Sequence, residues 1–151
     1  MDAESLRARI EAGLTFTHQV DGHTFRLVLP TRQRHDQIVR EAMGNDFAQT
    51  PASIGRYRVA LVQECLRGWE GPRVSDLWPD HEEAASPLPF GADTAQLVID
   101  ERTDWHDALY VELSRRINAR AEALKVDSGN SPSGSPGSGG APTTTTTAPL
   151  A

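Results

Sequence analysis

The sequence predicts a mostly helical α+β domain, in which an N-terminal β-hairpin is followed by about four helices and a disordered C-terminal tail. Apolar and polar residues alternate on both sides of a tight-turn signal at residues 21–22, which is typical of two half-buried strands. Further along the chain, apolar residues recur every three or four positions, as in amphipathic helices. From residue 127 the composition changes to Ser, Gly, Pro, Thr and Ala almost throughout. We therefore expect one small folded domain over residues 1–126 and a flexible tail over residues 127–151.

The N-terminal part predicts one short helix and the hairpin. In the helix, Leu6 and Ile10 lie one turn apart and form a modest apolar edge, and Gly13 supplies a stop. The hairpin turns at Asp21-Gly22, because glycine accepts the positive φ that a two-residue turn requires. The strands alternate apolar and polar residues, so each is expected to bury one face. The expected elements are a helix over residues 2–12 and strands over residues 14–20 and 23–29.

Four further helices follow from capping residues and from helical spacing. Thr31, Ser53 and Asp93 are expected to cap the first three, and the fourth begins at Thr103 or Asp104. The second of them carries the strongest apolar face in the first half of the chain, which places it at the centre of the core. On the last helix an apolar stripe runs through Trp105, Leu109, Leu113, Ile117, Ala121 and Leu124. The expected ranges are residues 32–43, 54–69, 94–101 and 105–124, with a proline-rich surface loop over residues 72–89.

Charge and cysteine content exclude several classes of protein. The chain of 151 residues has a formal net charge of −6, and 14 of its 15 basic residues are Arg. Binding to nucleic-acid backbones needs a clustered positive field, so we expect no nucleic-acid partner. A single cysteine permits no intramolecular disulfide, and no apolar run approaches the roughly 18 residues that cross a bilayer. We therefore expect a soluble protein of a reducing cytoplasm that makes no membrane contact.

The residues that could carry chemistry do not form a catalytic set. His18 and His23 flank the turn but lack a third ligand, so we expect two exposed turn histidines rather than a metal site. Cys65 lies on an apolar helix face near the helix C-terminus, where the helix dipole opposes a thiolate, and is expected to be a small buried hydrophobe. The sequence has no phosphate-binding loop, no Gly-x-Ser-x-Gly elbow and no His-Glu-x-x-His pair. We therefore expect no enzymatic activity, no cofactor and no metal.

Four aromatic residues lie at helix ends or in the loop, namely Trp69, Trp78, Phe90 and Trp105. Trp69 and Trp105 are expected to close the core where helices end. Trp78 stands between prolines and beside an acidic run. For this residue, closing the core and contacting a partner remain alternatives, since tryptophan is also enriched at protein interfaces.

An ordered series of short motifs extends over about residues 23–126. It consists of Phe25-Arg26-Leu27, a polar helix, Tyr57 leading to Leu66-Arg67-Gly68-Trp69-Glu70-Gly71, Leu88-Pro89-Phe90, and a closing amphipathic helix that begins at Trp105. This order and spacing resemble those of the tail assembly chaperones of long-tailed bacteriophages. The resemblance implies a helical fold with a small β element. It also implies structural roles for Trp69, Gly71, Phe90 and Trp105, and no catalytic residues.

The resemblance further implies a role in virion assembly. Such chaperones coat the long helical tape-measure protein, keep it soluble and help tail tube proteins polymerise around it. They act in the host bacterial cytoplasm and leave before the virion is complete, and self-association is compatible with this role. The candidate partner-binding residues are Trp78, Arg115, Arg116 and Arg120. The alternative is a structural virion component, such as a connector or a baseplate adaptor, which would be present in purified particles.

Overall fold

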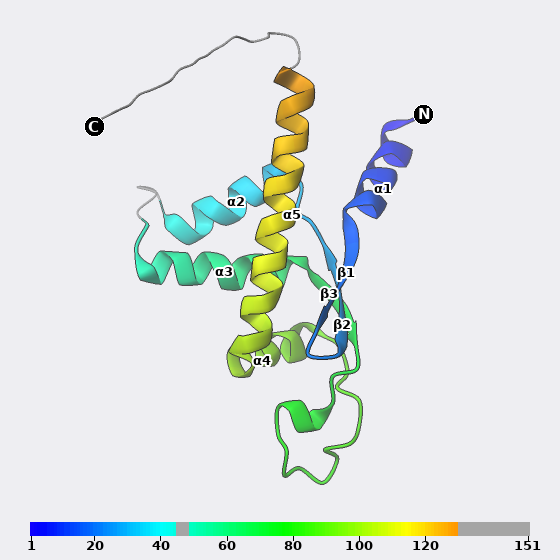
Figure 1. The fold of residues 1–151 in the computed structure, drawn as a ribbon, viewed down its shortest axis with the longest axis vertical. Coiled ribbons are helices and arrows are strands. Elements are labelled where there is room, and N and C mark those ends of the chain that lie inside the picture. Colours follow the sequence, from blue (N-terminus) through cyan, green and yellow to red (C-terminus); the bar gives the residue numbers. More distant parts are fainter. Residues whose placement is uncertain (45–48, 130–151) are drawn as a thin grey trace, which may run out of the picture. The chain divides into compact units, whose positions relative to one another are not determined.

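The computed structural model describes the backbone of residues 1–44 and 49–129, and the side chains of residues 1–44 and 49–125. The elements follow one another in the order α1 (Ala3–Leu14), β1 (Thr15–Val20), β2 (His23–Val28), α2 (Arg32–Met43), α3 (Pro51–Cys65), β3 (Leu66–Glu70), the 3₁₀ turn η1 (Val74–Asp76), α4 (Ala92–Glu101) and α5 (Thr103–Gly129) (Figure 1). This α+β, mostly helical arrangement confirms the predicted fold class. The predicted hairpin and the four helices after it are all present.

The chain divides into two compact units, one of residues 1–114 and one that begins at Arg115. The first unit contains the sheet, helices α1–α4 and the N-terminal turns of α5. In the second unit, the described residues are the remaining turns of α5, which ends at Gly129 rather than near residue 124. The predicted flexible tail lies outside the described residues from residue 130 onward and stays a prediction.

The hairpin of β1 and β2 forms as the sequence predicts. Asp21 and Gly22 have φ values of 56° and 80°, the pair of left-handed conformations that a two-residue turn needs. The register places Val20 opposite His23. One face of β2 and of the residue that follows it is buried, through Phe25, Leu27 and Leu29.

A third strand replaces the last turn of the second predicted helix after the hairpin. α3 ends at Cys65, and β3 pairs antiparallel with β2, so β2 lies at the centre of the three-stranded sheet. An isolated hairpin is marginally stable, and the backbone groups along the second edge of β2 need partners, which favours a strand over another helical turn. The first and third residues of β3 are buried, as in a half-buried strand. The prediction of a helix through Trp69 was therefore wrong.

Besides the ends of α3 and α5, three further helix boundaries are displaced from their predicted positions. Thr50, not Ser53, is the N-cap of α3. Its hydroxyl accepts from the Ser53 N–H, and the Ser53 hydroxyl oxygen accepts from the Thr50 N–H, which forms a capping box. A proline in the first turn favours this start, because its missing N–H would have been unpaired there. Gly91 rather than Asp93 stands at the N-cap of α4. α1 does not stop at Gly13 but continues for one more residue and leads directly into β1 (Figure 1).

The core of the first unit brings the sheet together with α3, α4 and the start of α5. Leu61, Val62 and Cys65 are fully buried, which confirms that α3 lies at the centre of the core. Other side chains with at most 1 % exposure are Phe25, Leu27, Val98, Trp105, Leu109 and Leu113. The apolar stripe predicted for the last helix is thus buried in its first half, whereas Leu124 is 47 % exposed. Among the described residues, no helix has both the length and the apolar character needed to span a bilayer.

The proline-rich segment between β3 and α4 is held together by its own backbone. The Val74 N–H donates to the Ser86 carbonyl at 2.9 Å, and the Leu88 N–H donates to the Pro72 carbonyl at 2.9 Å. These hydrogen bonds join the beginning of the segment to its end. The segment extends from the end of the sheet at which the hairpin turns (Figure 1).

Candidate functional site

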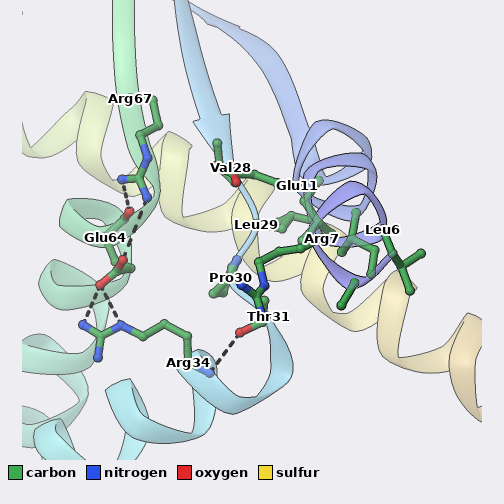
Figure 2. Close-up of a pocket in the computed structure, with 13 residues that line it drawn as sticks. Leu6, Arg7, Glu11, Val28, Leu29, Pro30, Thr31, Arg34, Glu64 and Arg67 are labelled. Carbon is green, nitrogen blue, oxygen red and sulfur yellow. Dashed lines mark hydrogen bonds and ion pairs between the residues drawn. The ribbon is translucent and has the colours of Figure 1, made fainter. Parts of the chain in front are cut away.

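An apolar groove of about 500 Å³ lies between α1 and the corner at which β2 leads into α2 (Figure 2). One wall is the face of α1 that carries Leu6 and Ile10. The other is made by Val28, Leu29 and Pro30. Leu6 is 50 % exposed and Ile10 is 42 % exposed, so the groove is open to solvent. The sequence contained a signal for this site in the apolar edge of the first predicted helix.

α1 is attached to the rest of the unit by its C-terminal end. Leu14 is its one buried residue, and the Leu14 carbonyl accepts a hydrogen bond from the Leu29 N–H at 2.9 Å. At the other end, the Asp2 carboxylate accepts a hydrogen bond from the Ser5 N–H at 2.7 Å, and this contact lowers the pKa of Asp2. The residues between these ends are exposed. The helix is therefore well capped but carries little packing of its own.

Charged side chains form the edge of the groove, namely Arg7, Glu11, Arg34, Glu64 and Arg67. The Glu64 Oε1 atom accepts from Arg34 Nε at 2.8 Å and from Arg34 Nη2 at 2.5 Å. This hydrogen bonding raises the pKa of Arg34. Arg67 Nη2 lies 3.9 Å from the other Glu64 carboxylate oxygen. Arg34 Nη1 also lies 3.8 Å from the Glu41 carboxylate, which is outside the lining. The lining itself contains three arginines and two glutamates, on a chain whose net charge is negative.

The chemistry of the lining suits a peptide side chain better than a small molecule. Small-molecule sites combine apolar walls with a few polar groups that converge inside the cavity. Here the walls are aliphatic and the charges lie at the edge. The Thr31 hydroxyl at the corner is engaged in capping α2, since it accepts from the Arg34 N–H at 3.2 Å. An apolar groove with a charged edge is a recurring geometry for binding one face of an amphipathic helix.

The residues predicted to contact a partner lie in two places. Trp78 is 60 % exposed, with its ring 4.6 Å from that of His81. It therefore does not close the core, and the partner contact stays a prediction. In the second unit, Arg115 is exposed, while Arg116 and Arg120 are half-buried. Their predicted role is likewise untested by this arrangement.

The motif residues around β3 make internal contacts. The Trp69 ring packs edge to face against Phe90 at 4.7 Å, and Trp69 Nε1 donates to the Leu88 carbonyl at 2.7 Å. Gly71 has a φ of 110°, and a Cβ atom at this position would lie 2.5 Å from His23 Nδ1. Only glycine fits there without strain. These contacts hold the end of β3 against the loop and the hairpin.

A polar cluster around Arg102 was not foreseen from the sequence. The guanidinium lies 2.8 Å from the Asp104 carboxylate, 3.5 Å from that of Asp21 and 3.6 Å from that of Asp76. It also lies 3.9 Å above the centre of the Trp105 ring. The hydrogen bond between Arg102 and Asp104 raises the pKa of Arg102 and lowers that of Asp104. The cluster joins the hairpin turn, the loop and the start of α5, three segments that no local pattern connects.

The histidines of the hairpin pair with acidic residues from other segments rather than with each other. His18 Nδ1 lies 3.7 Å from Glu112, and His23 Nε2 lies 3.6 Å from Asp76. Both histidines are half-buried, so the prediction of exposed turn residues was wrong. In the part of the chain that the structure describes, no three His, Cys, Asp or Glu side chains gather to hold a metal ion.

Cys65 is buried, as the sequence predicts. Its burial raises the pKa of the thiol to about 12. The side chain is therefore a thiol at neutral pH, which is a poor nucleophile.

Comparison of the chain with protein-family models, with curated proteins and with solved structures found no match. The groove along α1 and the series of motifs are thus the observations from which a function can be argued.

Proposed function

We propose that the protein is a bacteriophage tail assembly chaperone that binds the tape-measure protein, keeps it soluble and assists assembly of the tail tube around it. The apolar groove along α1 carries this proposal. A tape-measure protein is a long helical chain with apolar faces to protect, and the groove offers aliphatic walls to one such face and charges to its flanks. The motif series over residues 23–126 supports the same assignment.

The proposed activity is reversible binding, without catalysis, cofactor or metal. A groove of this size covers only part of a helix, so a single contact is expected to be weak. A long client presents many helical segments, and several chaperone copies along it would protect it together. Weak individual contacts also allow the chaperone to leave when tube proteins take its place. We place this cycle in the host bacterial cytoplasm and the chaperone outside the mature virion.

Co-expression with the tape-measure protein of the same phage genome tests the proposal. We expect the soluble fraction of the tape-measure protein to rise when this chain is present, and the two proteins to copurify. A tape-measure protein that stays insoluble, with no complex formed, would contradict the chaperone function. Mass spectrometry of purified particles separates the alternative: stoichiometric presence in mature virions would make the chain a structural component.

A further inference from the structure

We infer that the groove along α1 binds an amphipathic helix whose apolar face is flanked by carboxylates. The identity of the partner as the tape-measure protein rests on the proposed function. The kind of helix that is accepted follows from the groove itself, whose two walls and charged edge are seen together in Figure 2.

The first step is that α1 has an uncovered apolar face. An isolated helix of about 12–15 residues is marginal in water, and most helical stability comes from packing of an apolar face. α1 has 12 residues and buries only Leu14. Leu6 and Ile10, which line the groove together with Leu14, remain about half exposed. A second helix laid along them would supply the packing that α1 lacks.

The second step is that the opposite wall is fixed and equally apolar. Val28 and Pro30 are half-buried and Leu29 is 9 % exposed, and all three line the groove. Their backbone is held by the sheet on one side and by the capped start of α2 on the other. A partner helix would therefore meet a rigid wall and a helix attached at one end, and apolar side chains spaced three and four residues apart would fill the space between them.

The third step concerns charge. Arg34 and Arg67 share the carboxylate of Glu64, and Arg34 also lies 3.8 Å from the carboxylate of Glu41, which is exposed and does not line the groove. On the α1 side, Arg7 lies across from them with Glu11. The excess positive charge is therefore that of the lining itself, which has three arginines and two glutamates. A helix with carboxylates beside its apolar face would complement this edge, whereas one with lysines would be repelled.

Two designed peptides of about 20 residues, long enough to form a helix, provide the probes. They share leucines at helical spacing on one face and carry either Glu or Lys on the flanks; a third peptide has the leucines scrambled. We expect fluorescence anisotropy to show binding of the Glu peptide and no binding of the scrambled one. The Lys peptide should bind about two- to fivefold more weakly, and this difference should shrink as salt rises.

The paired substitution Leu6→Gln with Ile10→Gln tests the apolar wall. Glutamine preserves helix propensity, and both positions are exposed, so circular dichroism should show the fold unchanged. We expect affinity for the Glu peptide to fall at least about tenfold, as for the loss of a central anchor. The matched control is Leu97→Gln with Val111→Gln, which alters apolar residues that are 49 % and 64 % exposed outside the groove. This control should bind like the wild type.

Arg7→Glu tests the charge at the edge. We expect the ratio of the affinities for the Glu peptide and the Lys peptide to fall toward one or to reverse. Arg9→Glu makes the same change two residues along α1, at a position that does not line the groove, and should leave the preference intact.

The outcomes of these experiments distinguish failure of the inference about the groove from failure of the proposed function. If no peptide binds, or if the Leu6/Ile10 variant binds as well as its control, the inference is wrong. Concentration-dependent dimerisation that this variant abolishes would make a second copy the occupant and also overturn it. If the variant still solubilises the tape-measure protein, the groove is not the client site, although the proposed function stands. If the wild type binds the Glu peptide through Leu6 and Ile10 but does not solubilise the tape-measure protein, only the proposed function fails.

Discussion

The two ends of the sheet use similar side chains in opposite ways. At the hairpin turn, the Arg102 guanidinium contacts three aspartates and covers the ring of Trp105, which is fully buried. At the other end, where α1 leads into β1, Arg7 lines the same groove as Leu6 and Ile10, and these two apolar side chains remain about half exposed.

The difference distinguishes a region that stabilises the fold, at the hairpin turn, from a region along α1 that we propose to bind a partner. At the turn, the partners of the charged and aromatic groups come from distant segments of the same chain, so the contacts hold the fold together. Along α1 the apolar surface has no such cover. We therefore expect substitutions at the turn to change the free energy of unfolding, and substitutions along α1 to change binding.

The largest expected effect is the loss of the buried indole at the turn. Trp105→Ala should lower the free energy of unfolding by about 3–5 kcal/mol, because it removes a large buried side chain and leaves a cavity. Leu6→Ala at the other end should stay within about 0.5 kcal/mol of the wild type. Urea unfolding measures both. A loss at Leu6 as large as that at Trp105 would mean that α1 is packed and that the groove is filled in solution.

A smaller effect is expected from removing each arginine. Arg102→Ala should cost about 1–3 kcal/mol, since it removes the guanidinium beside the half-buried carboxylate of Asp76, which then keeps, among the described residues, only its contacts with His23 and the Arg73 N–H. Arg7→Ala should be almost silent in the same unfolding measurement. Equal costs for the two substitutions would contradict the distinction between a structural arginine and one at a binding edge.

The smallest expected effect is on the pH dependence of the free energy of unfolding. The hydrogen bond from Arg102 holds the pKa of Asp104 below its ordinary value of 3.8. Its stabilising contribution is therefore present above that value and lost as the pH falls through the lowered pKa. Asp104→Asn should make unfolding less sensitive to pH in this acidic range, by a small amount because the side chain is 62 % exposed. Asp93→Asn, at an exposed position of α4, is the control. Equal pH sensitivity in all three proteins would refute this contribution.

The lowered pKa of Asp2 predicts a local counterpart at the α1 end. Here protonation should loosen the first turn of α1, which NMR of the Ser5 amide would report, without a matching change in global unfolding. A coincident global change would instead link α1 to the core.

Local chemistry was sufficient for much of this fold. Positive φ at Asp21 and Gly22 makes the hairpin turn, and the Thr31 cap starts α2 at its predicted residue. The period of 3.6 residues identified the buried face of α3, because burial of that face is decided by spacing along a single helix. The fold class and most element positions were therefore predictable. The site was predictable only as an apolar edge at Leu6 and Ile10.

Tertiary structure alone decided the rest. Leu66 is buried in β3 and would also have faced inward in a longer helix, so only the unpaired edge of β2 selected the strand. Trp105 and Asp21 meet across 84 positions of sequence, a distance over which no periodic pattern carries information. The same limit applies to the groove. The sequence predicts that α1 has an apolar edge, but whether that edge is covered depends on where the chain leaves the helix and enters the sheet.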